Sequence, residues 1–110
     1  MAVQTSPALT YLDEIVRRLV QHFNPVQIVL FGSHARYQAD EASDLDLLVV
    51  LDKVDHKRET AIAMRRVLSD LPVAKDIFVA TLEEVARLKG CFWHVVGQAI
   101  QEGRVIYERT

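Results

Sequence analysis

The chain has 110 residues, of which 50% are hydrophobic and 25% are charged, and its formal net charge is -2. This composition is typical of a globular protein and excludes a disordered, collagen-like or coiled-coil chain, while the length fits a single domain over residues 1–110. The slight excess of acidic residues argues against direct nucleic-acid binding through phosphates, so we expect a small substrate or a protein partner.

Membrane and disulfide signals are absent from the sequence. No apolar run approaches the ~20 residues that a membrane helix needs, and the N-terminus lacks the pattern of a secretory signal. Cys91 is the only cysteine, which excludes an internal disulfide framework and a cysteine-based zinc site. These features predict a cytoplasmic protein that does not bind a membrane.

The first predicted elements are a helix and a short strand. Ser6 and Pro7 are typical of a helix start, and Asn24-Pro25 predicts the helix end. The β-branched, apolar segment Val26–Phe31 precedes a glycine, so we expect a buried strand followed by a turn. Apolar residues recur at helical spacing within the helix at Leu9, Leu12, Ile15, Val16, Leu19, Val20 and Phe23.

Two strands and a helix are predicted in the middle of the chain. Leu45–Leu51 is apolar except for Asp46, which predicts a strand covered on both faces of a sheet. A helical stripe runs from about Asp55 to Leu71, where the next residue, a proline, stops it. Val73–Val79 is a third strand candidate and also contains an acid, Asp76.

Two helices and a short strand are predicted in the last part of the chain. Thr81–Glu84 has the form of a capping box, and Gly90 is expected to end the helix that it begins. Apolar residues recur at helical spacing within Phe92–Ile100, Gly103 ends this second helix, and Val105–Tyr107 predicts a terminal strand. The alternation of helices and strands predicts an α/β (α+β) fold around a small sheet.

Acidic residues within apolar strands are the main anomaly, because an unpaired buried carboxylate costs several kcal/mol. Asp44 and Asp46 are two residues apart, so strand alternation sends both side chains to one face. If Asp76 lies on a neighbouring strand, three carboxylates converge, and charges ~4 Å apart repel by ~4 kcal/mol at an effective dielectric of ~20. A divalent cation would reverse that repulsion, and carboxylate ligands favour magnesium or manganese over zinc.

Gly32 and Ser33 directly follow the first predicted strand. Glycine at a strand-to-helix turn lets main-chain N–H groups approach a phosphate without an intervening side chain. A phosphate-binding turn next to a metal site predicts a nucleotide as the ligand.

The spacing of these residues resembles the signature of a known superfamily. The stretch GSHARYQADEASDLDLLVV contains Gly32-Ser33, ten intervening residues and then Asp44-Leu45-Asp46. It is similar to the DNA polymerase beta-like nucleotidyltransferases, and most similar to their minimal nucleotidyltransferase (MNT) class. The resemblance extends from the first helix to the closing EGRVIYE, and it implies the polymerase beta-like palm fold, a small mixed sheet flanked by helices.

The resemblance implies roles for individual residues. Asp44, Asp46 and Asp76 would be catalytic and would bind two Mg²⁺ ions, or Mn²⁺, with Asp76 beside the attacking hydroxyl. Gly32 and Ser33 would bind the β- and γ-phosphates of ATP.

The same resemblance places Arg36 near the nucleotide. At the next position the chain departs from the family pattern, because Tyr37 stands where the family usually has glycine.

The resemblance also implies a partner protein. Members of the MNT class occur as antitoxins in two-gene toxin–antitoxin pairs, so the chain would transfer AMP from ATP to a tyrosine of a HEPN-type toxin encoded nearby. Two alternatives stay open. One is a catalytically silent antitoxin that neutralises its partner by binding, and the other is a transferase acting on a small molecule in a pocket formed by a homo-oligomer.

Other conspicuous residues have a structural interpretation. Asp44 alone fits a turn before a strand, but this does not explain Asp46 or Asp76. The four histidines lack metal-ligand spacing. Phe92 and Trp93 fit either the core or an interface, and an isolated aromatic pair before a helix more often belongs to the core.

Overall fold

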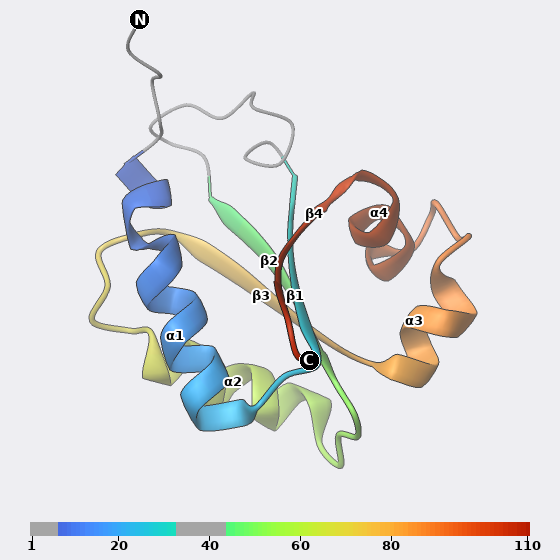
Figure 1. Cartoon of the computed structure of the whole chain (residues 1–110), viewed down its shortest axis with the longest axis horizontal. Coiled ribbons are helices and arrows are strands. Elements are labelled where there is room, and N and C mark those ends of the chain that lie inside the picture. The colour runs from blue at the N-terminus through green and yellow to red at the C-terminus, as the bar shows by residue number, and fades with distance from the viewer. Residues whose placement is uncertain (1–6, 33–43) are drawn as a thin grey trace, which may run out of the picture.

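The computed structural model describes residues 7–32 and 44–110 (Figure 1). Within these residues no helix has the length and apolar character needed to cross a membrane. Ser6, Ser33, Arg36 and Tyr37 lie outside the described residues. The elements follow one another as the 3₁₀ helix η1 (Pro7–Tyr11), α1 (Leu12–Phe23), β1 (Gln27–Phe31), β2 (Leu45–Leu51), α2 (Lys57–Val67), β3 (Lys75–Thr81), α3 (Leu82–Leu88), α4 (Val95–Glu102) and β4 (Arg104–Glu108).

The described strands form one sheet in the order β3-β2-β1-β4. Strand β1 is antiparallel to both β2 and β4, whereas β2 and β3 are parallel. This mixed sheet confirms the predicted fold class, and all four strands occupy segments in which the sequence predicted a strand.

Helices cover both faces of the sheet (Figure 1). Helices α1 and α2 lie on one face and α3 and α4 on the other. Strand β2 is buried on both faces, as its apolar sequence predicts, because successive side chains alternate between two apolar clusters. On the α1/α2 face these are Leu45, Leu47, Val49 and Leu51, and on the α3/α4 face they are Leu48 and Val50.

Several predicted boundaries are wrong by a few residues. The first helix begins with a 3₁₀ turn, and its α-helical part starts at Leu12. Helix α2 ends at Val67, before the predicted Leu71, and Ser69 Oγ donates to Arg66 O at 2.9 Å. Such side-chain bonds compete with main-chain helix bonds. Strand β3 starts at Lys75 rather than two residues earlier.

The last two helices begin at side-chain caps. The predicted capping box of α3 is confirmed, since Glu84 N donates to Thr81 Oγ1 at 3.1 Å and Thr81 N donates to Glu84 Oε1 at 3.2 Å. His94 Nδ1 accepts a hydrogen bond from Val96 N at 3.1 Å, which gives this histidine a structural role as the cap of α4.

Phe92 and Trp93 lie outside the core, which the sequence favoured over an interface. Their exposed fractions are 57% and 82%. The turn that contains them is fixed by its backbone, because His94 N donates to Cys91 O at 3.1 Å and a side chain at Gly97 would overlap that same carbonyl. Close packing of α4 against the turn therefore leaves both rings outside the core.

Candidate active site

Two of the predicted site residues lie opposite each other on neighbouring strands. In the parallel β2–β3 pair Asp46 aligns with Asp76, and in the antiparallel β1–β2 pair Asp46 aligns with Phe31. Neighbouring strands are ~4.8 Å apart, so this row of three residues brings both carboxylates to one end of the sheet.

The two aspartates share the α3/α4 face of the sheet. Side chains two residues apart in a strand point to the same face. Leu48 and Phe78, two residues after Asp46 and Asp76, pack into the cluster on the α3/α4 face. Asp46 is partly buried, whereas Asp76 is exposed. Asp44 is also exposed and lies immediately before β2, at the same end of the sheet.

Gly32 follows β1 and lies against the Asp46 carboxylate. Its φ is +75°, a conformation that side-chain-bearing residues rarely adopt. A Cβ built at this position would lie 3.2 Å from Asp46 Cγ and would overlap Oδ2. Both the positive φ and the close approach of Asp46 therefore require glycine at this position. The glycine and the aspartate of the sequence motif are in direct contact.

The surroundings of the acids are set by aromatic and basic residues. The rings of Phe31 and Phe78, on the same face, have centroids 5.6 Å apart and form an apolar floor next to the acids. Lys75 Nζ donates to Leu71 O at 3.3 Å and to Val73 O at 2.9 Å, and burial lowers the pKa of this amine. These bonds hold the segment that enters β3 and so position the strand that carries Asp76.

The donor chemistry and the register fit a divalent cation. Carboxylate oxygens are the ligands that Mg²⁺ and Mn²⁺ prefer, and strand pairing places Asp46 and Asp76 side by side with Asp44 two residues upstream. Over residues 7–32 and 44–110, however, no three His, Cys, Asp or Glu side chains are gathered closely enough to form a metal cluster. The backbone thus brings the acids to one end of the sheet without gathering their side chains around one point.

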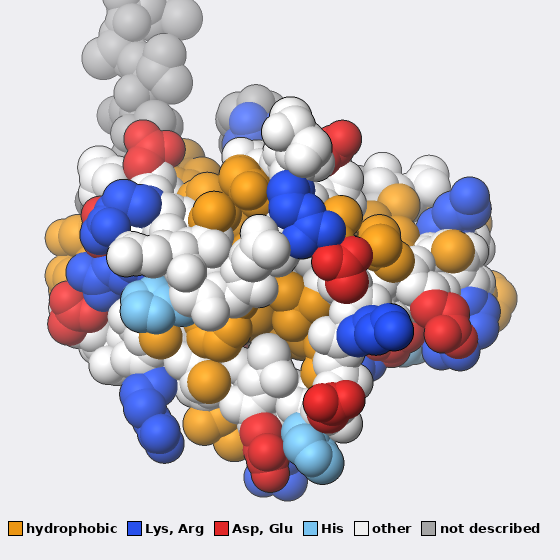
Figure 2. Space-filling model, turned by 60° about the horizontal axis from the view of Figure 1, so that its bottom comes forward, with side chains coloured by type: hydrophobic (Ala, Val, Ile, Leu, Met, Phe, Trp, Pro, Cys, Tyr) orange, Lys and Arg blue, Asp and Glu red, His pale blue; other side chains and the backbone are white. Residues whose placement is uncertain are grey.

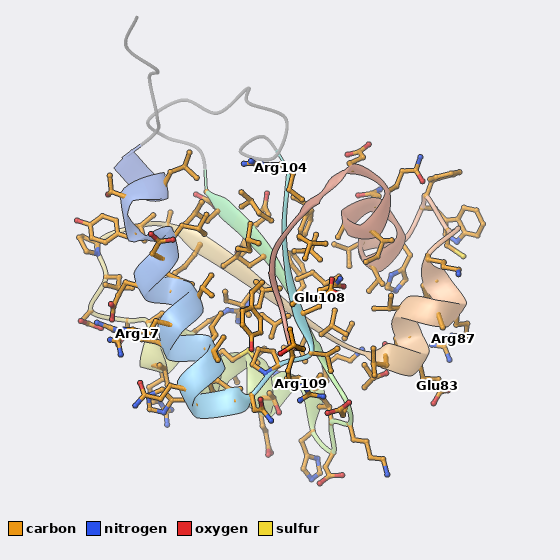
Figure 3. The ribbon with its side chains drawn as sticks, viewed as in Figure 1. Arg17, Glu83, Arg87, Arg104, Glu108 and Arg109 are labelled. Carbon is orange, nitrogen blue, oxygen red and sulfur yellow. The ribbon has the colours of Figure 1, made fainter. Side chains whose placement is uncertain are left out.

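Arg104 is a residue at this end of the sheet that the sequence interpretation did not select. It pairs with Leu30 of β1, two residues before Gly32. Figure 3 shows Arg104 at one end of β4, with Glu108 and Arg109 at the other end. The only sequence signal was its place directly after Gly103 in the closing EGRVIYE.

On one face of the molecule, side chains of both charges are mixed. Figure 2 shows a face on which Lys and Arg alternate with Asp and Glu around hydrophobic side chains. On this face the described side chains form no basic stripe of the kind typical of nucleic-acid binding.

Comparisons with known proteins identify similar chains. A family model described as "Polymerase beta, Nucleotidyltransferase" matches residues 13–110. The "Putative protein adenylyltransferase MJ1305" of Methanocaldococcus jannaschii is 40% identical over 62 residues, which is 54% of this chain. The match spans only 40% of that relative's length.

A solved structure shares the fold. The crystal structure of a "putative nucleotidyltransferase" from Sulfolobus solfataricus aligns with a TM-score of 0.64 over 93% of this chain and 81% of that one. The sequence identity is 22%.

Proposed function

Because the chain belongs to the Polymerase beta, Nucleotidyltransferase family, we propose that it transfers AMP from ATP to a tyrosine hydroxyl of a partner protein, a HEPN-type toxin encoded nearby. The observation that carries this proposal is the row formed by Asp46 and Asp76, with Gly32 folded against the Asp46 carboxylate. The protein would act as the antitoxin of the pair.

The transfer makes one phosphorus–oxygen bond and breaks another. The acceptor oxygen bonds to the α-phosphorus of ATP, the bond from that phosphorus to the β-phosphate oxygen breaks, pyrophosphate leaves, and the hydroxyl proton passes to water. Asp44, Asp46 and Asp76 would hold Mg²⁺, which supplies positive charge for the triphosphate and for the acceptor oxygen. Asp76, exposed at the start of the outer strand, borders the side from which an acceptor would enter.

Three arguments support a tyrosine of another protein as the acceptor. The acids lie at one end of the sheet where Asp44 and Asp76 are exposed, so a segment of a partner can reach them. A phenol has a pKa near ~10 and ionises more readily than an aliphatic hydroxyl. The name of the relative from Methanocaldococcus jannaschii also refers to a protein acceptor.

The test is an incubation of this protein with its genomic neighbour, ATP and Mg²⁺, followed by mass spectrometry. We expect the neighbour to gain one or more AMP units. Asp46→Asn should lower the rate by a factor on the order of 10³, because a charge that stabilises the transition state is lost. Asp13→Asn, the same change at an exposed position on α1, is the matched control and should transfer normally.

Thermal unfolding completes the test. Both variants should unfold close to the melting temperature of the unmodified protein. ATP should raise that temperature with Mg²⁺ but not with EDTA. Binding of the neighbour without any mass increase, together with full neutralisation of the toxin by Asp46→Asn, would leave a scaffold in place of an enzyme.

A further inference from the structure

Strand β3 is the outer strand of the sheet on the side of the acids. Leu45 N donates to Ala74 O at 3.0 Å, and in a parallel ladder alternate residues turn their main-chain groups to the same neighbour. Ile77 and Val79 consequently direct their N–H and C=O groups away from β2. No other described segment pairs its main chain with this edge.

A groove of about 390 Å³ follows this edge. Its floor is Ile77–Val79, and its walls come from the start of α2 and the start of α4. Phe92 and Trp93, both more than half exposed, immediately precede the α4 wall. The wall residues are Lys57, Arg58 and Ala61 on α2 and His94, Val95 and Val96 at α4.

The α2 wall of the groove is basic. Lys57 is paired with Glu84, but Arg58 forms no ion pair within the described part of the chain. Arg65, two turns further along, reaches Ile77 O at 3.5 Å, which is the outer limit of a hydrogen bond. A second copy of the chain would bring an equally basic wall to this edge, so repulsion disfavours self-pairing and favours an acidic occupant.

We propose that this groove binds an extended segment of the partner protein, with alternating apolar and acidic side chains, by strand addition to β3. Main-chain groups of the segment would pair with Ile77 and Val79, its apolar side chains would contact the groove floor and Trp93, and its acids would face Arg58. The proposal deepens the transferase function and rests on it. Asp76 directly precedes Ile77, and residues in a strand advance by ~3.3 Å, so such a segment runs toward the acids.

The experiment uses the only tryptophan of the chain as its probe. A short acetylated peptide of alternating valine and glutamate is titrated without ATP or metal, and Trp93 emission is recorded. We expect saturable binding with a shift of emission to shorter wavelength. Peptides with lysine for glutamate, or with proline for valine, should bind at least about tenfold more weakly, since they lack the charge or the main-chain donors.

Variants separate the groove from the catalytic residues. Arg58→Glu should weaken peptide binding on the order of tenfold, because an attraction becomes a repulsion. Arg66→Glu, the same change at an exposed position of α2 outside the groove, should not weaken it. Asp46→Asn should bind the peptide normally although it loses transfer. Peptide binding by an unmodified protein that transfers no AMP would refute only the transferase.

Three results would overturn the inference. The first is equal binding of the proline and valine peptides, and the second is equal loss of binding in Arg58→Glu and Arg66→Glu. The third is a dimer, detected by sedimentation without peptide, in which Trp93 emission is already shifted; the occupant would then be a second copy. Any of these results, found together with normal AMP transfer by the unmodified protein, would refute the groove and leave the transferase.

Discussion

The two faces of the sheet differ in how they are closed. The α1/α2 face holds the larger buried cluster, which includes Ile15, Leu19, Leu47, Met64 and Leu68. The α3/α4 face holds a smaller cluster, and its sheet surface continues into Asp46 and Asp76 instead of further apolar residues. One face is thus filled along its length, whereas the other leaves one end for polar groups.

Ion pairs strengthen the contrast. Arg18 donates to Glu14 Oε2 at 2.7 Å, to Asp70 Oδ1 at 2.5 Å and to Val67 O at 3.1 Å, so one guanidinium links α1 to the segment after α2. Hydrogen bonds from Arg17 and Arg18 lower the pKa of Glu14 to about 2, and the hydrogen bond from Arg18 lowers the pKa of Asp70. The α1/α2 face therefore contributes most to the stability of the fold, whereas the α3/α4 face carries the acids of the candidate active site. Three variants test this separation.

The largest effect on stability is expected from Leu19→Ala. Leu19 is fully buried on the α1/α2 face, so its truncation removes apolar burial and leaves a cavity, at a cost of ~2–5 kcal/mol. Chemical denaturation measures this loss, and transfer per folded molecule should be unchanged. Ile62→Ala, at a position 41% exposed, is the control with a small cost. A fall in the rate per folded molecule would show that the faces are coupled.

Gly32→Ala should lower both the stability of the fold and the rate of AMP transfer. The new Cβ meets the Asp46 carboxylate at a positive φ, and such backbone strain costs ~1–3 kcal/mol. Because the displaced group is the Asp46 carboxylate, the rate of AMP transfer per folded molecule should also fall, by more than the loss of folded protein explains. Gly90→Ala is the control, since nothing lies within 4 Å of its added Cβ. Normal transfer by Gly32→Ala would contradict the contact between glycine and acid.

The smallest effect is expected from Glu14→Gln, and it should depend on pH. The folded-state pKa of Glu14, about 2, lies below its ordinary 4.5, so its stabilisation is present above pH ~4.5 and is lost as the pH falls toward 2. At neutral pH the variant should melt about 1–4 °C lower than the unmodified protein. The difference should vanish near pH 2, and Glu83→Gln, whose partner Arg87 is 3.9 Å away, should change little at either pH. A difference in melting temperature that does not change with pH would mean that Glu14 stabilises the fold through packing.

Local signals in the sequence accounted for most of the elements. The capping box at Thr81, the apolar run Leu45–Leu51 and the terminator after Phe23 depend on neighbouring residues, and each is found where the sequence predicted it. The spacing of Gly32 and the aspartates also led to the nucleotidyltransferase family, and Gly32 and Asp46 belong to consecutive strands that pair antiparallel.

Other features depend on residues that are distant in the chain, and only the tertiary structure decided them. The alignment of Asp46 with Asp76 requires the β2–β3 register, which alternation within one strand does not specify. The exposure of Trp93 follows from the packing of α4 on the preceding turn, and the open edge at Ile77 follows from the strand order. Sequence pattern sets which face a residue occupies, whereas pairing and packing set what lies opposite it.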